Sequence, residues 1–68
     1  MTLDERLLKA HEKDDRSALV ALYTEAADQA ADIDAQCFYL THAYVFALEL
    51  GDARAVELYK HLAAHDRV

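Results

Sequence analysis

The sequence predicts an all-α protein of four antiparallel helices, and three observations support this class. Proline is absent from the 68 residues, and glycine occurs once. Alanine is abundant and β-branched residues are few, a balance that favours helix over strand. Apolar side chains recur at helical spacing, and the breaks between periodic segments are short, which makes consecutive helices antiparallel neighbours. We expect one domain, residues 1–68, with helices at about 3–12, 15–31, 35–50 and 53–65.

The first two helices have recognisable starts and one apolar face each. Thr2 and Glu5 have the spacing of a capping box, in which each side chain binds a backbone amide at the other position. Asp14 or Asp15 is placed to cap the second helix. The expected apolar faces are Leu3, Leu7, Leu8, Ala10 and His11 in the first helix, and Leu19, Leu22, Tyr23, Ala26, Ala27 and Ala30 in the second.

The segment from Cys37 to Leu50 is the most apolar in the chain, interrupted only by Thr41, His42 and Glu49. A helix that is apolar nearly all round must be covered on most of its sides. The helix at 35–50 is therefore expected at the centre of the domain. It is too short and too punctuated to cross a bilayer, which needs about 20 predominantly apolar residues.

The ends of this central helix also carry expected signals. With Asp34 as N-cap, Ile33 and Phe38 are placed to pack together as a hydrophobic staple. Gly51 suits the left-handed position that ends many helices. Asp52 is then expected to cap the fourth helix.

The predicted core centres on two side chains of the central helix. Leu40 and Tyr44 should be buried, facing Leu22 on the second helix and Tyr59 or Leu62 on the fourth. This assignment places the third helix between the second and the fourth.

The charge balance limits the classes of partner. Thirteen acidic residues against seven basic ones give a formal net charge of −6 at pH 7. Such a chain repels phosphate backbones and anionic membranes, so neither a nucleic-acid nor a membrane partner is expected.

Size and cysteine content predict a cytoplasmic protein that associates with itself. A chain this short buries only about 60% of the surface that its unfolded form exposes. Domains of this size usually need disulfides, a metal or a second copy. A single cysteine, Cys37, cannot form an intrachain disulfide and fits a reducing compartment, and residues 1–6 lack the pattern of a secretory signal. We therefore expect a homodimer.

The two halves of the chain match at an offset of thirty-seven residues, within the range of periods that indicate repeats. Identical residues recur at this offset: Ala10, Glu12, Asp15, Ala18, Ala26 and Ala27 match Ala47, Glu49, Asp52, Ala55, Ala63 and Ala64.

The second half has a further pattern of large, small and aromatic residues around a Gly-Asp turn: Leu40, Ala43, Tyr44, Gly51, Asp52, Ala55, Tyr59 and Leu62. This order resembles a tetratricopeptide repeat, and the first half carries a weaker copy. The resemblance implies two helix-turn-helix hairpins with a protein-binding role. Because Thr41 stands where that family favours glycine and no proline ends the repeat, the resemblance is to a tetratricopeptide-like hairpin pair rather than to an orthodox array member.

One side of the central helix is the candidate interface: Phe38, Thr41, His42, Val45 and Glu49. A face that mixes large apolar residues with polar ones is typical of a surface that meets a partner. The alternative is that the first helix covers this face within one chain. The leading hypothesis is an interaction or assembly module, with a second copy or another protein as partner. Under this hypothesis the protein is not an enzyme, and we expect neither catalytic residues nor a cofactor.

Two alternatives involve chemistry. Glu57, His61 and His65 are spaced four residues apart on the fourth helix, and two histidines at this spacing can chelate Zn, Cu or Ni. Their simpler interpretation is a solvated helix end. Cys37 lies in the first turn of its helix, where a thiolate is favoured, although a buried small apolar side chain is the simpler role. A metal- or thiol-dependent regulatory or catalytic protein is thus the alternative function, and a subunit whose partner completes its core is a third.

Overall fold

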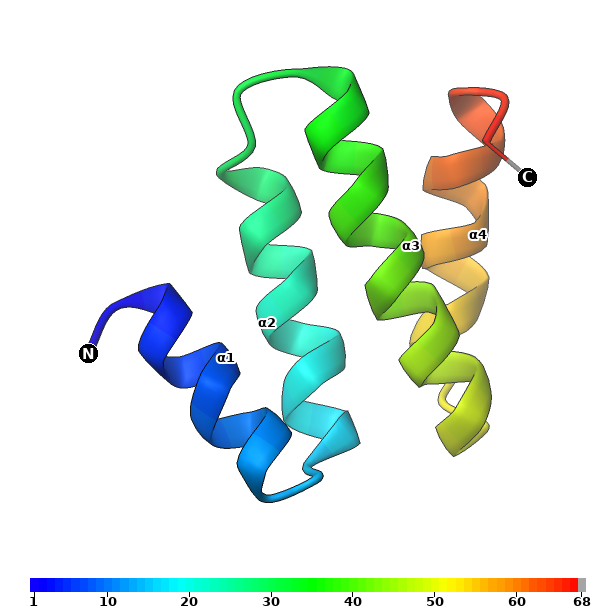
Figure 1. Cartoon of the computed structure of the whole chain (residues 1–68). Coiled ribbons are helices and arrows are strands. Elements are labelled where there is room, and N and C mark those ends of the chain that lie inside the picture. The colour runs from blue at the N-terminus through cyan, green and yellow to red at the C-terminus, as the bar shows by residue number, and fades with distance from the viewer. Residues whose placement is uncertain (68) are drawn as a thin grey trace.

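The computed structural model describes residues 1–67, which form four α-helices joined by short turns (Figure 1). No strand occurs in this part of the chain, so the predicted all-α class and the four helices are confirmed. No helix within it is both long and apolar enough to cross a membrane. The helices are α1 (Leu3–Glu12), α2 (Arg16–Asp28), α3 (Ile33–Leu50) and α4 (Arg54–Ala64).

The first two helices begin as the sequence predicts. The hydroxyl of Thr2 accepts a hydrogen bond from the Glu5 amide at 3.2 Å, and the Glu5 carboxylate accepts one from the Thr2 amide at 3.3 Å. The carboxylate of Asp15 accepts from the Ala18 amide at 3.1 Å, which makes Asp15 the cap of α2. These bonds satisfy amides that have no partner within the helix.

The start of α3 differs from the prediction. The N-cap is Asp32, whose carboxylate accepts from the Ala35 amide at 2.8 Å, and Asp34 lies inside the first turn. The predicted staple is wrong, because Ile33 and Phe38 are 52% and 59% exposed. The physical reason is the shift of the cap, since Ile33 becomes the first helical residue and no longer precedes the N-cap, as a staple requires.

The turn between α3 and α4 is built on Gly51, which has φ 66° and ψ 32° as predicted. The amide of Gly51 donates to the Leu48 carbonyl at 3.1 Å, and that of Asp52 donates to the Ala47 carbonyl at 2.9 Å. This pair of bonds is the Schellman arrangement of a helix C-terminus. Asp52 then lies one position before the N-cap of α4, which is Ala53, and not at the N-cap itself.

Asp52 nevertheless holds the start of α4, and this predicts an acid-sensitive contribution to stability. Hydrogen bonds from the Arg54 guanidinium (2.7 Å) and backbone amide (2.8 Å) lower the pKa of the Asp52 carboxyl to about 2. Because the folded-state pKa lies below the unfolded value, this contribution is present above about pH 4 and disappears as the pH falls towards 2. Asp52→Asn should therefore lower the melting temperature at pH 6 and flatten its fall between pH 4 and 2.

Thermal unfolding of both proteins from pH 2 to 6 measures this difference. Asp28→Asn, which neutralises an exposed carboxylate on α2, is the control and should leave the pH profile close to that of the parent. Parallel profiles for Asp52→Asn and the parent would contradict the assignment.

The four helices form a single layer. Within residues 1–67, the helix backbones pack closely between α1 and α2, α2 and α3, and α3 and α4 (Figure 1). Side chains also bridge helices that are not adjacent in the chain: the rings of His11 on α1 and Phe46 on α3 have centroids 6.1 Å apart. The Arg54 guanidinium of α4 donates to the Ser17 hydroxyl of α2 at 3.2 Å. The Cα atoms extend over 32 × 29 × 11 Å. Stacked helices have axes about 8–10 Å apart and Cα cylinders of about 2.3 Å radius, so two layers would need about 13–15 Å. The expectation that α3 is covered on most sides is therefore wrong.

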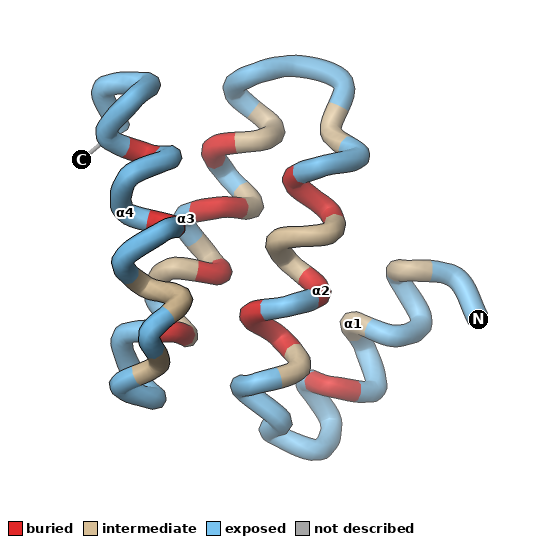
Figure 2. The backbone as a smooth tube through the Cα atoms, turned by 180° about the vertical axis from the view of Figure 1, so that it is seen from behind, coloured by how far each residue is buried: buried red, intermediate tan, exposed pale blue. Residues whose placement is uncertain are grey.

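Buried stretches alternate with exposed ones along the helices (Figure 2). The larger core cluster joins α2, α3 and α4, and the smaller one joins α1 and α2. The buried members of the larger cluster are Val20, Ala27, Cys37, Leu40, Ala43, Ala47, Leu58 and Leu62, and those of the smaller are Ala10, Leu19 and Leu22.

The predicted core pairs are confirmed in part. Leu40 is buried in the same cluster as Leu62, as expected. Leu22 belongs instead to the smaller cluster, and Tyr44 is only half-buried. The reason is that α2 lies between two neighbours and buries two faces. Helical periodicity predicts a single buried face for this helix and therefore misses Val20, which is fully buried.

Candidate functional site

The outer face of α3, consisting of Phe38, Thr41, His42, Val45 and Glu49, is uncovered in this fold. Phe38 and Val45 are 59% and 45% exposed, and His42 is half-buried. α1 packs on α2 and reaches α3 through the His11 ring, which lies against Phe46 with centroids 6.1 Å apart. Because Phe38, Thr41, Val45 and Glu49 stay exposed, the alternative that α1 covers this face is wrong. The predicted residues therefore share an exposed surface, whose role as an interface remains a prediction.

A cluster of aromatic rings lies beneath the outer face of α3. The Tyr23 ring on α2 stacks on His42 with centroids 5.1 Å apart and on Phe46 at 5.9 Å. The hydroxyl of the same tyrosine lies 2.9 Å from Nε2 of His11 on α1. Tyr39 stacks on the same ring at 6.3 Å. The rings link three helices and restrict the side chains behind the outer face.

Sequence reasoning did not find this cluster, although part of its signal was present. Tyr39, His42 and Phe46 follow the i, i+3, i+7 spacing of one helix side. The contributions of Tyr23 and His11 depend on how α1 and α2 pack, which no local pattern shows.

The tautomer of His42 follows from its hydrogen bond. Nδ1 lies 2.9 Å from the Phe38 carbonyl oxygen. Because a carbonyl oxygen only accepts, Nδ1 carries the hydrogen, and Nε2 of the neutral ring is the acceptor. The His42 ring lies between the rings of Phe38 and Tyr23, with centroid distances of 4.6 and 5.1 Å. His42 thus presents one hydrogen-bond acceptor from a fixed ring on the outer face.

The outer face is hollowed between His42 and Glu49 and carries an ion pair at each end. A hollow of about 270 Å³ is lined by Thr41, His42, Val45, Phe46 and Glu49. At the C-terminal end of the face, Glu49 pairs with Arg16 of α2 at 3.3 Å. At its N-terminal end, Asp34 pairs with Arg67. Exposed pairs of this kind contribute only about 0–1 kcal/mol to stability, so their importance lies in where they place charge.

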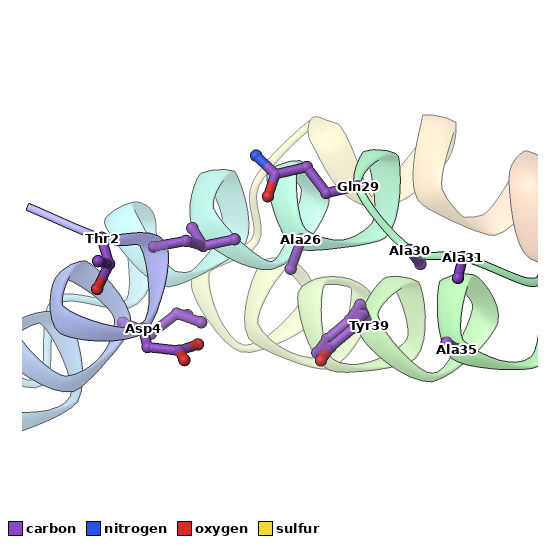
Figure 3. A pocket seen from close by; sticks show the side chains of 10 residues that line it. Thr2, Asp4, Ala26, Gln29, Ala30, Ala31, Ala35 and Tyr39 are labelled. Atoms are coloured by element: carbon purple, nitrogen blue, oxygen red, sulfur yellow. The ribbon is translucent and has the colours of Figure 1, made fainter.

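A second hollow lies where α1 diverges from the ends of α2 and α3 (Figure 3). It has a volume of about 420 Å³ and is bounded by short side chains, including Ala26, Ala30 and Ala35. Its polar side chains are Thr2, Asp4, Gln29 and Tyr39, with the Asp4 carboxylate and the Tyr39 ring on different helices (Figure 3). The hollow therefore has a mixed polar and apolar lining, with room for a side chain.

Comparison with known proteins gave no match to a protein-family model, to a curated protein or to a solved structure. The tetratricopeptide resemblance therefore depends on the quoted residues alone and stays a prediction.

The residues of the two chemical alternatives are not brought into a common site. His61 and His65 are exposed on α4 and at its end, and Glu57 pairs with Lys60 at 3.6 Å. Within residues 1–67, no group of three or more potential metal ligands gathers. Cys37 is 3% exposed in the larger core cluster, which is the environment expected for a small apolar side chain.

Proposed function

We propose that this protein is a small cytoplasmic interaction module, and that it associates with a second copy of itself through the outer face of α3. The observation that carries the proposal is the exposure of Phe38 and Val45, 59% and 45%, on a face that no other helix of residues 1–67 covers. The tetratricopeptide-like pattern adds support, because the resemblance implies a protein-binding role.

The arrangement of apolar surface matters more here than its amount. The accessible surface is 4424 Å². A compact monomer of this mass, 7.7 kDa, has about 4,300 Å², so total exposure alone does not require a partner. Isolated apolar side chains are normal on protein surfaces. Phe38 and Val45, however, lie two helical turns apart on one line of α3, with the His42 ring between them and against Phe38, so the two exposed apolar side chains belong to one face.

A subunit of a larger assembly is the second candidate, and the single layer favours it. Besides the outer face of α3, a hollow of about 410 Å³ lies between α3 and α4, lined by Tyr44, Leu48, Ala55, Val56, Tyr59 and Lys60. Leu48, Val56 and Tyr59 are 54%, 58% and 49% exposed. A different protein that covers this second surface would complete the core of the domain.

Val45→Glu tests the proposed function. We expect the parent to have the mass of a dimer by size-exclusion chromatography with light scattering, and the variant that of a monomer. The new carboxylate would be buried in the contact beside Glu49, and burying an unpaired charge is strongly unfavourable. Far-ultraviolet circular dichroism should be unchanged, because position 45 is exposed in the isolated chain.

Val56→Glu is the matched control, since Val56 is an exposed valine on α4 outside the outer face of α3. It should leave the dimer intact. A dimer that is split by Val56→Glu and not by Val45→Glu would move the interface to the hollow between α3 and α4. A parent that is monomeric at high concentration would overturn self-association.

A further inference from the structure

The hollow on the outer face has the form of a hole in knobs-into-holes packing. Four of its five lining residues, His42, Val45, Phe46 and Glu49, follow the i, i+3, i+4, i+7 spacing, and the fifth is Thr41. In this packing, one side chain of a facing helix inserts among four such residues. The hollow measures about 270 Å³. A cavity of about 150 Å³ is enough to hold benzene, so a phenyl ring fits.

Phe38 has the form of the matching knob. Its side chain is 59% exposed, and its ring rests on His42 and Tyr39 of the same chain, with centroids 4.6 and 5.5 Å apart. It lies on the same line of α3 as the hole, and the hole centre, between Val45 and Phe46, is about 11 Å further along the helix at 1.5 Å per residue.

A knob and a hole on one line of one helix are self-complementary under a two-fold axis. Consider a two-fold axis that is perpendicular to α3 and passes beside His42. Each position of one α3 then faces the position of the other α3 that lies equally far from His42 in the opposite direction along the chain. This axis therefore brings each Phe38 to the hole of the other copy, in an isologous contact. We propose that two copies pack α3 against α3 in this antiparallel register, with each Phe38 filling the partner's hole. The inference rests on the proposed self-association and adds its geometry.

The charges of the face fit the same register. Antiparallel packing around His42 places Asp34 close to the partner's Glu49. Each of these carboxylates already has an arginine in its own chain, Arg67 for Asp34 and Arg16 for Glu49. Each end of the contact would therefore hold two carboxylates and two guanidinium groups. A parallel packing would instead place Phe38 against Phe38 and leave both holes empty.

The small size of this contact predicts a weak dimer. α3 has 18 residues, so it is about 27 Å long. A strip one helix wide along that length is smaller than the roughly 800 Å² per partner of a standard interface. Association should depend on concentration and must be measured at high micromolar protein.

Disulfide trapping with single cysteines tests the register. Cys37→Ala provides the background, and His42→Cys, Asp34→Cys and Glu49→Cys are added one at a time. A disulfide requires Cα atoms within about 7 Å. We expect His42→Cys to cross-link with itself under oxidised glutathione, because position 42 lies beside the axis. Asp34→Cys or Glu49→Cys alone should not, since each lies more than about 20 Å from its own symmetry mate. A mixture of these two variants should cross-link.

The outcomes separate this inference from the proposed function. Self-cross-linking of Asp34→Cys and Glu49→Cys, each alone, would indicate parallel helices and overturn the register while leaving self-association. A dimer by light scattering without cross-links at any of these positions would also overturn the register. Monomeric parent and Cys37→Ala proteins, both folded by circular dichroism, would overturn the register and self-association together.

Discussion

Truncation of Leu62 to alanine is expected to lower the free energy of unfolding by about 2–5 kcal/mol. Leu62 is fully buried, and with Leu58 it is one of the two buried residues of α4. Among the helices, α4 packs most closely on α3, so few other contacts compensate for the lost side chain. Since small domains have about 5–15 kcal/mol in total, this change removes a large fraction of the stability.

Urea unfolding followed by circular dichroism measures the effect. The matched control is Leu8→Ala, a helical leucine that is 60% exposed on α1. It should change the free energy of unfolding by no more than about 0.5 kcal/mol. Similar midpoints for Leu62→Ala and the parent would show that Leu62 does not anchor α4.

Enlarging Ala43 to leucine is expected to destabilise the protein by about 1–3 kcal/mol or more. Ala43 and Ala47 are both fully buried in the cluster where α2, α3 and α4 meet. Their short side chains leave room for Val20, Leu58 and Leu62 of the neighbouring helices. A leucine at position 43 would push at least one neighbour away from α3.

The control for this enlargement is Ala21→Leu, at an exposed position of α2. Leucine and alanine are both good helix formers, so the control should unfold close to the parent midpoint. If Ala43→Leu also unfolded there, the packing assigned to this side of α3 would be incorrect.

Features that depend on a few neighbouring residues could be predicted from the sequence. The capping box of Thr2 and Glu5, the cap at Asp15 and the left-handed Gly51 each involve residues at most five positions apart, and the structure contains all of them. The start of α3 was harder, because Asp32 and Asp34 are both acceptable caps by local pattern.

Features that depend on how helices pack could be predicted only in part. The mixed outer face of α3 was visible in the sequence because its residues share one helix side. That α2 buries two faces, and that Tyr23 joins His11 to His42, follow from the order of the helices in the layer. Helical periodicity gives the direction of each side chain around its own axis and does not say how many neighbours that helix has.

The closest packing is between helices adjacent in the chain, and this order also determines how the protein folds and opens. Loops that must close before such contacts form are short, so contact order is low and folding should be fast. Each helix is stabilised mainly by its interface with the next helix, as in a linear repeat array. α1 contributes buried side chains to the small cluster alone and touches α3 through the His11 and Phe46 rings, so it can detach while the buried residues of the larger cluster stay packed. The native state should therefore include a partly opened form in which α2, α3 and α4 stay packed and the amides of α1 exchange with solvent.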